Sequence, residues 1–274
     1  MLACAEVLPG APRLPVRLRD VAATLLGPLY ARAADARRLL PLLGDELACE
    51  LVDRLDHDFS RFAPRPRFAP VVRTLVFDDL VRRFLHGHPT GTVVEVGAGL
   101  NTRFERLDNG RQRWFDVDLP EVTTLRRALL PPSVRRTHTA ASIVDASWLD
   151  LIATARPPVC FVFEAVIGYV GDQLRTVLER IARRFPGSTL AFDLHPRWRL
   201  VGGGLVMSDR PENLLLAGSL PRSIERWQIG LDLVETIRFL DWAPHRIGPR
   251  VLCPMRPNDG APYVIAQFVV ATTS

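Results

Sequence analysis

The 274-residue sequence contains no lysine, so arginine supplies all 35 of its basic side chains. Against 30 acidic residues this gives a formal charge of +5 and a sequence pI of about 9.5. Such a balance can indicate nucleic-acid binding, but lysine is normally among the commonest residues, and its complete absence indicates a coding bias instead. Acidic and basic side chains also alternate, as in Asp78-Asp79 and Arg82-Arg83. We therefore expect a mixed surface and no nucleic-acid partner.

Other absences exclude further classes of protein. No apolar run approaches the roughly 20 residues of a membrane helix, and the N-terminus lacks the cationic start and long apolar core of a secretion signal. Four cysteines are present, far apart and without C-x-x-C spacing: Cys4, Cys49, Cys160 and Cys253. They match neither a disulfide framework nor a zinc site. We expect a soluble, cytoplasmic protein with reduced thiols, no membrane contact and no metal.

The composition, with 47% apolar and 24% charged residues, is that of a globular protein. Residues 1–88 have helical spacing and irregular connectors, and we expect them to form an N-terminal helical cap. Helices are predicted over Val16–Leu40, with a kink or break at Gly27-Pro28, over Leu43–Leu55 beginning near Asp45, and over Val71–Leu85. The proline-rich stretch Phe62–Pro70 predicts a connector.

Residues 89–274 alternate between strand and helix patterns. The predicted strands are Thr92–Val96, Arg113–Asp118, Arg136–Ser142, Pro158–Phe163, Ser188–Leu194, Leu231–Phe239 and Tyr263–Ala271. The predicted helices are Glu121–Leu130, a short one near Trp148, and Asp172–Phe185. Strands separated by helices indicate βαβ units, so the sequence predicts an α/β fold with a largely parallel sheet.

A glycine loop follows the first of these strands. Gly97 and Gly99 allow a tight turn and close approach of a ligand, although a purely structural turn is the alternative. Thr102 stands where a dinucleotide fingerprint would have its third glycine, which counts against NAD. Glu95 completes the pattern E-x-G-x-G, which is used for S-adenosylmethionine, whose amino and sulfonium groups are positive.

Carboxylates also follow the second and fourth strands of this core. Asp116 and Asp118 alternate onto one face, and a carboxylate at this strand end can accept both hydroxyls of a ribose. Asp118 could equally cap the helix that begins at Pro120. Glu164 follows the strand ending at Phe163, at the edge where open α/β sheets bind ligands.

These segments together resemble the leucine carboxyl methyltransferase family, in the branch with tetracenomycin-type polyketide O-methyltransferases. The resemblance rests on V-E-V-G-A-G-L-N-T-R at 94–103 and W-F-D-V-D-L-P-E at 114–121, with further matches at 73–79, 141–148 and 164–169. It extends from about Leu26 to the C-terminus. Asn101 departs from the pattern, because many relatives have aspartate there.

The resemblance implies a Rossmann-like class I methyltransferase fold: a seven-stranded sheet, antiparallel at its last strand, with N-terminal helices covering the substrate. It implies S-adenosylmethionine as cofactor and S-adenosylhomocysteine as product. By motif position, Arg73 would lie near the methionine carboxylate, Asp118 at the ribose, Ser142 near the adenine and Glu164 at the methionyl amino group. The implied cofactor set is Arg73, Glu95, Gly97, Ala98, Gly99, Asp118, Leu119, Ser142, Ile143 and Glu164.

The acceptor decides which further groups are needed. A carboxylate, with a pKa near 4, is already ionised and needs positioning, for which Tyr169 is favoured over Arg73, Arg103 and the pair Tyr30 and Arg32. A phenol, with a pKa near 10, would need a base, and His195 is best placed of the histidines, ahead of His57 and His138. The favoured interpretation of His195 is nevertheless a partly buried, hydrogen-bonded side chain before Pro196.

We therefore expect an O-methyltransferase of secondary metabolism that forms a methyl ester on a small-molecule carboxylate. The alternatives are O-methylation of an aromatic polyketide hydroxyl, carboxyl methylation of a peptide C-terminus, and cofactor binding without catalysis. Both monomer and homodimer remain open.

Overall fold

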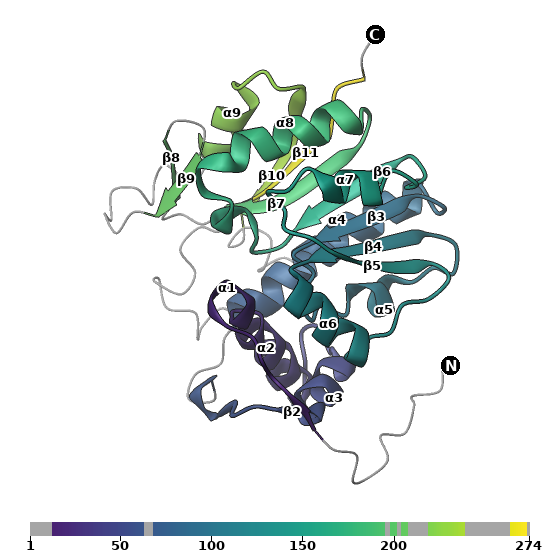
Figure 1. Ribbon diagram of the computed structural model, residues 1–274, viewed down its shortest axis with the longest axis vertical. Helices are drawn as coiled ribbons and strands as arrows, with labels where there is room; N and C mark the ends of the chain where they lie inside the picture. Colours follow the sequence, from purple (N-terminus) through teal and green to yellow (C-terminus); the bar gives the residue numbers. More distant parts are fainter. Residues whose placement is uncertain are drawn as a thin grey trace.

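The computed structural model describes residues 13–62, 68–194, 198–201, 204–207, 219–238 and 264–272 (Figure 1). A seven-stranded sheet lies at its centre, in the order β10-β11-β7-β6-β3-β4-β5. Its strands are β3 (Thr92–Val96), β4 (Arg113–Asp118), β5 (Arg136–Ala140), β6 (Val159–Phe163), β7 (Thr189–Leu194), β10 (Leu231–Arg238) and β11 (Val264–Val270). Strand β11 runs antiparallel to both of its neighbours, β10 and β7, and the other pairs of neighbouring strands in this sheet are parallel. The predicted fold, including the antiparallel last strand, is confirmed.

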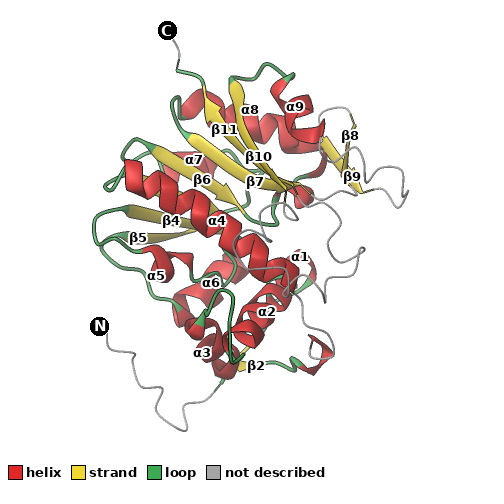
Figure 2. Ribbon diagram, turned by 180° about the vertical axis from the view of Figure 1, so that it is seen from behind, coloured by secondary structure: helices red, strands yellow, loops and turns green. Residues whose placement is uncertain are grey.

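Helices cover both faces of this sheet. One face packs against α7 (Ser147–Leu151), α8 (Leu174–Arg184) and α9 (Leu220–Glu225), and the other against α4 (Phe68–Gly87) and α5 (Arg103–Leu107) (Figures 1 and 2). The alternation of side chains along each strand explains this, since Val94 faces the first group and Val93 the second. The remaining helix of this part, α6 (Pro120–Leu129), follows β4.

The N-terminal elements form a smaller layer beside α6. They are β1 (Leu14–Pro15), α1 (Asp20–Ala23), α2 (Leu26–Ala36), α3 (Glu46–Arg54), β2 (Leu55–Asp56) and η1 (Ser60–Phe62). Leu26, Leu29 and Leu51 share an apolar cluster with Leu129 of α6. Short elements β8 (Trp198–Val201) and β9 (Gly204–Met207) form a separate hairpin, and η2 (Ile167–Tyr169) and η3 (Gly171–Gln173) follow β6.

The predicted helix over Val16–Leu40 is wrong in its extent. The structure has two helices, α1 and α2, which separate at Thr24. The hydroxyl of Thr24 donates to the carbonyl oxygen of Val21 at 2.6 Å, and this hydrogen bond competes with those of a continuing helix. Pro28 lies in the first turn of α2, where its missing N–H breaks no hydrogen bond.

Two other helix boundaries follow from local chemistry. The prediction that Asp45 begins a helix is confirmed, since its carboxylate accepts the N–H of Ala48 at 3.2 Å. The connector predicted to reach Pro70 is too long, because α4 begins at Phe68 and accommodates that proline in its first turn.

The predicted division at residue 88 falls just after α4. Val76 and Phe77 of this helix share an apolar cluster with Val93 of β3 and Val162 of β6, so the helix packs on the sheet as well as on the cap. The assignment of residues 1–88 to a cap therefore stays a prediction. No helix in the described ranges is long and apolar enough to cross a membrane.

Asp116, in the middle of β4, is a buried anion held by two buried arginines. It is 1% exposed, and it accepts hydrogen bonds from Arg126 at 3.0 Å and from Arg136 at 2.7 Å. The indole of Trp114 donates to it as well, at 3.1 Å. Asp118, two residues nearer the carboxyl end of β4, forms hydrogen bonds with different partners.

Replacing Asp116 with asparagine should destabilise the protein by roughly 3–5 kcal/mol, because it leaves two buried guanidinium groups without their anion. The control is Asp53→Asn, which breaks an exposed pair with Arg37 and should cost about 1 kcal/mol or less. Urea unfolding at pH 7 measures both. Equal losses in the two variants would contradict the account.

Candidate active site

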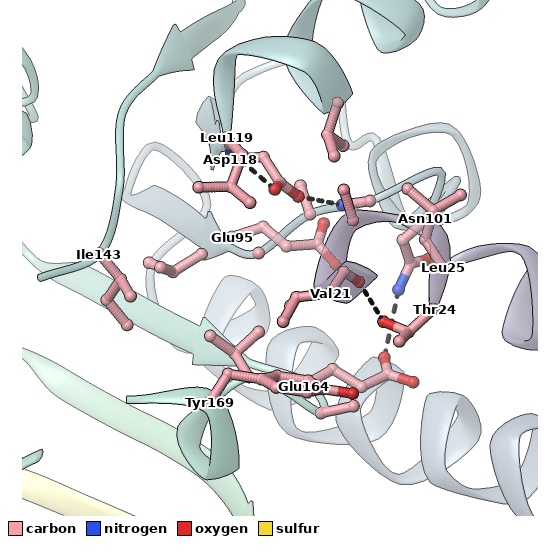
Figure 3. A pocket seen from close by; sticks show the side chains of 18 of the residues that line it. Val21, Thr24, Leu25, Glu95, Asn101, Asp118, Leu119, Ile143, Glu164 and Tyr169 are labelled. Carbon is pink, nitrogen blue, oxygen red and sulfur yellow. Dashed lines mark hydrogen bonds between the residues drawn. The ribbon is translucent and has the colours of Figure 1, made fainter. Parts of the chain in front are cut away.

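A cavity of about 640 Å³ opens at the carboxyl ends of β3, β4 and β6, under α1 and α2 (Figure 3). Its volume is within the range of about 300–1,000 Å³ that is usual for small-molecule sites. It is lined by every residue of the predicted site that the structure describes: Arg73, Glu95, Gly97, Ala98, Gly99, Asp118, Leu119, Ser142, Ile143, Glu164 and Tyr169. His195 lies outside the described residues.

The glycine loop forms the floor of this cavity. Gly97 has φ +66°, and a Cβ there would come within 2.2 Å of Cγ2 of Val166. Gly99 has φ +50° and a Cβ on it would meet Leu25 of the cap at 3.3 Å. Both positions therefore need glycine, and backbone rather than side chains faces the cavity at this point.

Asp118 is positioned by two backbone N–H groups. Its Oδ2 accepts from Gly99 and its Oδ1 from Leu119, each at 2.7 Å. It makes no capping bond to α6, so the capping alternative is wrong. A carboxylate has about four acceptor sites, which leaves two for the hydroxyls of a diol. Burial raises the pKa of Asp118, while the two N–H groups oppose that rise.

Glu164 is saturated with hydrogen bonds. Its Oε1 accepts from Arg73 at 3.1 Å and from Thr74 at 2.9 Å, and its Oε2 accepts from Asn101 at 3.1 Å and from Arg103. Although burial opposes ionisation, the guanidinium groups, Arg103 above all, lower the pKa of Glu164 to about 2. Glu164 is therefore a fixed anion in the cavity wall.

Glu95 differs because one of its oxygens has no partner among the described residues. Its Oε1 pairs with Arg103, while its buried Oε2 accepts no hydrogen bond from any of them. Burial raises the pKa of Glu95 to about 7, against the opposing charge of Arg103. A buried acceptor without a donor is costly, and a positively charged ligand group in the cavity would satisfy it.

The remaining predicted groups lie on the wall and at the mouth. Nε of Arg73 contacts Glu164, and its NH1 lies 3.7 Å from Oδ2 of Asp193, a buried carboxylate at the end of β7. Tyr169, in η2, is 55% exposed and reaches the cavity from its rim (Figure 3). Ser142 and Ile143 follow β5 and line the cavity beyond Asp118.

Comparison with known proteins assigns the chain to a family. The family model for leucine carboxyl methyltransferase matches residues 26–182. The tetracenomycin polyketide synthesis O-methyltransferase TcmP of Streptomyces glaucescens is 33% identical over 232 residues, which are 82% of this chain and 86% of TcmP. This chain belongs to the leucine carboxyl methyltransferase family. It is an S-adenosylmethionine-dependent methyltransferase of class I.

Two further proteins are similar to it. The S-adenosyl-L-methionine-dependent methyltransferase dpfgK of Gibberella zeae is 31% identical over 191 residues, covering 63% of this chain and 64% of dpfgK. The N-methyltransferase NodS of Bradyrhizobium japonicum WM9, solved with S-adenosyl-L-homocysteine, has 16% identity and a TM-score of 0.45, covering 82% of this chain and 99% of NodS.

The cavity fits the cofactor of this family by its own chemistry. The pair of open acceptor sites on Asp118 suits a ribose, and the unpartnered Glu95 oxygen suits the positive methionyl end. Gly97 and Gly99 leave room where a Cβ would intrude. The cavity therefore has groups that are complementary to the ribose and to the positive methionyl end of this cofactor.

The other residues predicted to position an acceptor are engaged in contacts within the protein. Arg103 is 0% exposed and bound to three carboxylates, so the prediction that it could hold an acceptor is wrong. Tyr30 stacks on Phe59, with 5.7 Å between the ring centroids. Arg32 lines the cavity, but its Nε lies 2.9 Å from Oδ2 of Asp45, with which it forms an ion pair.

The two weaker histidine candidates are also apart from the cavity. His138 is buried 3.5 Å from Asp116, and burial lowers its pKa to about 4. His57 packs edge-on against Phe59 in the cap. Neither lines the cavity, so neither is placed to act as a base there.

Sequence reasoning missed several lining residues. Asn101 was noted only as a departure from the family pattern, yet it both lines the cavity and bonds Glu164. Further ones come from α1, the start of α2 and the segment around η2 and η3, among them Val21, Ala22, Thr24, Leu25, Pro28, Val166, Val170 and Gln173. The helical spacing of the N-terminal residues predicted helices, but it carried no information about which part of the sheet those helices would cover.

Changing Asp118 to asparagine should raise the Kd for S-adenosylhomocysteine roughly 10- to 100-fold, because an amide cannot accept two ribose hydroxyls and both N–H groups. Isothermal titration calorimetry measures this. The matched control is Asp145→Asn, an exposed carboxylate in the loop after β5, which should bind normally. Unchanged affinity in Asp118→Asn would contradict the assignment.

The ionisation of Glu164 should make the free energy of unfolding depend on pH in the acidic range. Its folded pKa is lowered to about 2, so its stabilising contribution is present above the unfolded value of about 4.5 and is lost as the pH falls from there towards 2. The difference in unfolding free energy between the wild type and Glu164→Gln should therefore be several kcal/mol at pH 7 and should shrink steadily below about pH 4.5. A difference that is constant with pH would contradict this.

Proposed function

We propose that this methyltransferase transfers its methyl group to the carboxylate of a small-molecule metabolite and forms a methyl ester. The observation that carries the proposal is the state of Glu164. This carboxylate, beside Arg73 in the cavity wall, already accepts four hydrogen bonds and is held ionised by its arginines. It is therefore unsuited to taking a proton from an acceptor, and an acceptor that arrives already ionised has no such need.

The chemistry required of the protein is then mainly alignment. When bound, S-adenosylmethionine supplies a methyl group already activated by its sulfonium. An oxygen of the acceptor would form the new bond to the methyl carbon while the carbon–sulfur bond breaks. The electron pair of the broken bond would stay on the sulfur. No proton moves in this step, so the chain must hold the two partners in line and exclude water.

We assign the roles in this alignment by position. Asp118 would hold the ribose, Leu119, Ser142 and Ile143 the adenosine end, and Arg73 the methionine carboxylate. Glu95, with its unpartnered oxygen, would meet the methionyl end together with Glu164 and the Gly97–Gly99 backbone. Tyr169 would position the acceptor from the rim.

The acceptor end of the cavity suits a largely apolar molecule. The cap contributes Val21, Leu25 and Pro28, and α4 contributes Pro70. Exclusion of water by such a surface favours the reaction of an ionised oxygen with a sulfonium, because both charges are neutralised in the products. The N-terminal helices would thus form a substrate-covering layer over the site.

A second candidate is O-methylation of an aromatic hydroxyl. The similarity to TcmP, whose name places that protein in polyketide synthesis, supports a polyketide acceptor and is compatible with either a hydroxyl or a carboxylate on it. A hydroxyl acceptor must lose a proton, and His195 would be the base to test. Turnover would then decrease at pH values below the pKa of that base. A carboxylate acceptor would instead give nearly constant turnover from about pH 6 to 9.

The two candidates are separated by the product. A panel of aliphatic acids, aromatic acids and phenols is incubated with enzyme and methyl-labelled cofactor, and the labelled product is then treated with base. We expect the label to be released as methanol, because a methyl ester hydrolyses. A label that survives base marks an aryl ether and would contradict the carboxylate proposal.

Tyr169→Phe should lower kcat/KM for the accepted substrate roughly 5- to 10-fold, through loss of one hydrogen bond to the acceptor. Its affinity for S-adenosylhomocysteine should stay within about twofold of the wild type, since the phenol lies at the rim. Tyr30→Phe is the matched control, because that ring is stacked inside the cap. If both variants have wild-type turnover, Tyr169 does not position the acceptor.

A further inference from the structure

Arg103 is a fully buried guanidinium outside the cavity wall. It is the first residue of α5, it is 0% exposed, and the cavity lining does not include it. Its face lies over the ring of Phe77, with 5.7 Å between Cζ and the ring centroid. An isolated charge in such a place would be strongly destabilising, so its partners must account for its presence.

Each of its three nitrogens bonds a different carboxylate. Nε donates to Asp78 of α4 at 2.7 Å, NH1 donates to Glu95 of β3, and NH2 donates to Glu164 at the end of β6. One planar group therefore joins a helix and two strands that are far apart in the sequence. A lysine could not do this, because it offers one nitrogen rather than three in a fixed plane.

Two of these three partners are cavity residues. Glu95 and Glu164 both line the cavity, whereas Asp78 does not. Without the guanidinium between them, the two buried carboxylates would repel each other, and either movement or protonation would relieve the repulsion. Asn101 and Arg73 also hold Glu164, but neither of them donates to Glu95.

We propose that Arg103 is a positioning residue for methyl transfer: it fixes the spacing of Glu95 and Glu164 and favours the ionised form of both, and so sets the affinity for the methionine half of the cofactor without touching it. The proposal rests on the cofactor dependence of the family and on the residue roles assigned above, and it is independent of whether the acceptor is a carboxylate or a hydroxyl.

The chain offers a matched control in Arg136. This arginine is also buried, at 2%, and also bridges carboxylates, namely Asp116 and Glu105. It differs in the one respect that matters, because neither it nor its two partners lines the cavity. A change of Arg136 to lysine should therefore reproduce the loss of stability that comes from disturbing a buried arginine, without any effect on the cavity.

The experiment compares Arg103→Lys with Arg136→Lys by calorimetric titration with two ligands. S-adenosylhomocysteine carries the amino acid end, whereas 5′-methylthioadenosine lacks it. Arg103→Lys should raise the Kd for S-adenosylhomocysteine by about tenfold or more and leave that for 5′-methylthioadenosine within about twofold. Arg136→Lys should leave both affinities near wild type, although both variants lose thermal stability.

Three results would overturn the proposal. These are wild-type binding of S-adenosylhomocysteine by Arg103→Lys, equal loss for both ligands, and equal loss in both variants. Arg103→Met removes the charge as well and is expected to unfold the protein. Should Arg103→Lys also fail to fold, Asp78→Asn keeps Arg103 and both cavity carboxylates but removes the charge that anchors Nε of Arg103, at 2.7 Å and outside the cavity lining. It should weaken the binding of S-adenosylhomocysteine selectively, and an equal effect on both ligands would overturn the proposal.

Discussion

Buried carboxylates at the carboxyl edge of the sheet depend on the arginine guanidiniums that lie between them. Arg103 joins Asp78, Glu95 and Glu164, and Arg106 extends the same network to Asp45 at the start of α3. Desolvated charges are tolerated only when geometry and hydrogen bonding compensate for the lost water, and here nearly every carboxylate oxygen has a donor. Among the described residues, two buried carboxylate oxygens lack one: Oδ2 of Asp193 and Oε2 of Glu95, and Glu95 lines the cavity.

The same network attaches the cap to the cofactor loop. Asp45 accepts from Arg32 of α2 at 2.9 Å and from Thr102 at 2.7 Å, and Arg32 also donates to the carbonyl of Leu100 at 2.7 Å. Helix α2 is therefore bonded directly to the segment that follows Gly99. Because residues of α1 and α2 line the cavity opposite the glycine loop, these hydrogen bonds hold the two walls of the site together.

The network also gives part of the arginine content a structural reason. A coding bias stays our prediction for the absence of lysine, but the buried arginines use the guanidinium fork in ways that lysine could not. Arg126 and Arg136 share Asp116 in the middle of β4, just as Arg73 and Arg103 share Glu164 at the end of β6. The arginine content therefore serves interior ion pairs as well as the surface.

Strand periodicity and motif spacing predicted most of the sheet and the position of Gly97, Asp118 and Glu164, because the carboxyl ends of parallel strands must meet at one edge. They did not predict the role of Arg103. Its spacing after the glycines leaves the side-chain direction open, and three partners on three elements are a property of the packing. The break at Thr24 was missed for a similar reason, since it depends on one local hydrogen bond.

A crystal structure with S-adenosylhomocysteine tests the central claim most directly. The account predicts that the ribose hydroxyls lie on the carboxylate of Asp118, that the methionyl amino group contacts Glu95, and that Arg103 keeps its three partners. A ligand bound outside this cavity, or an amino group distant from both Glu95 and Glu164, would contradict it.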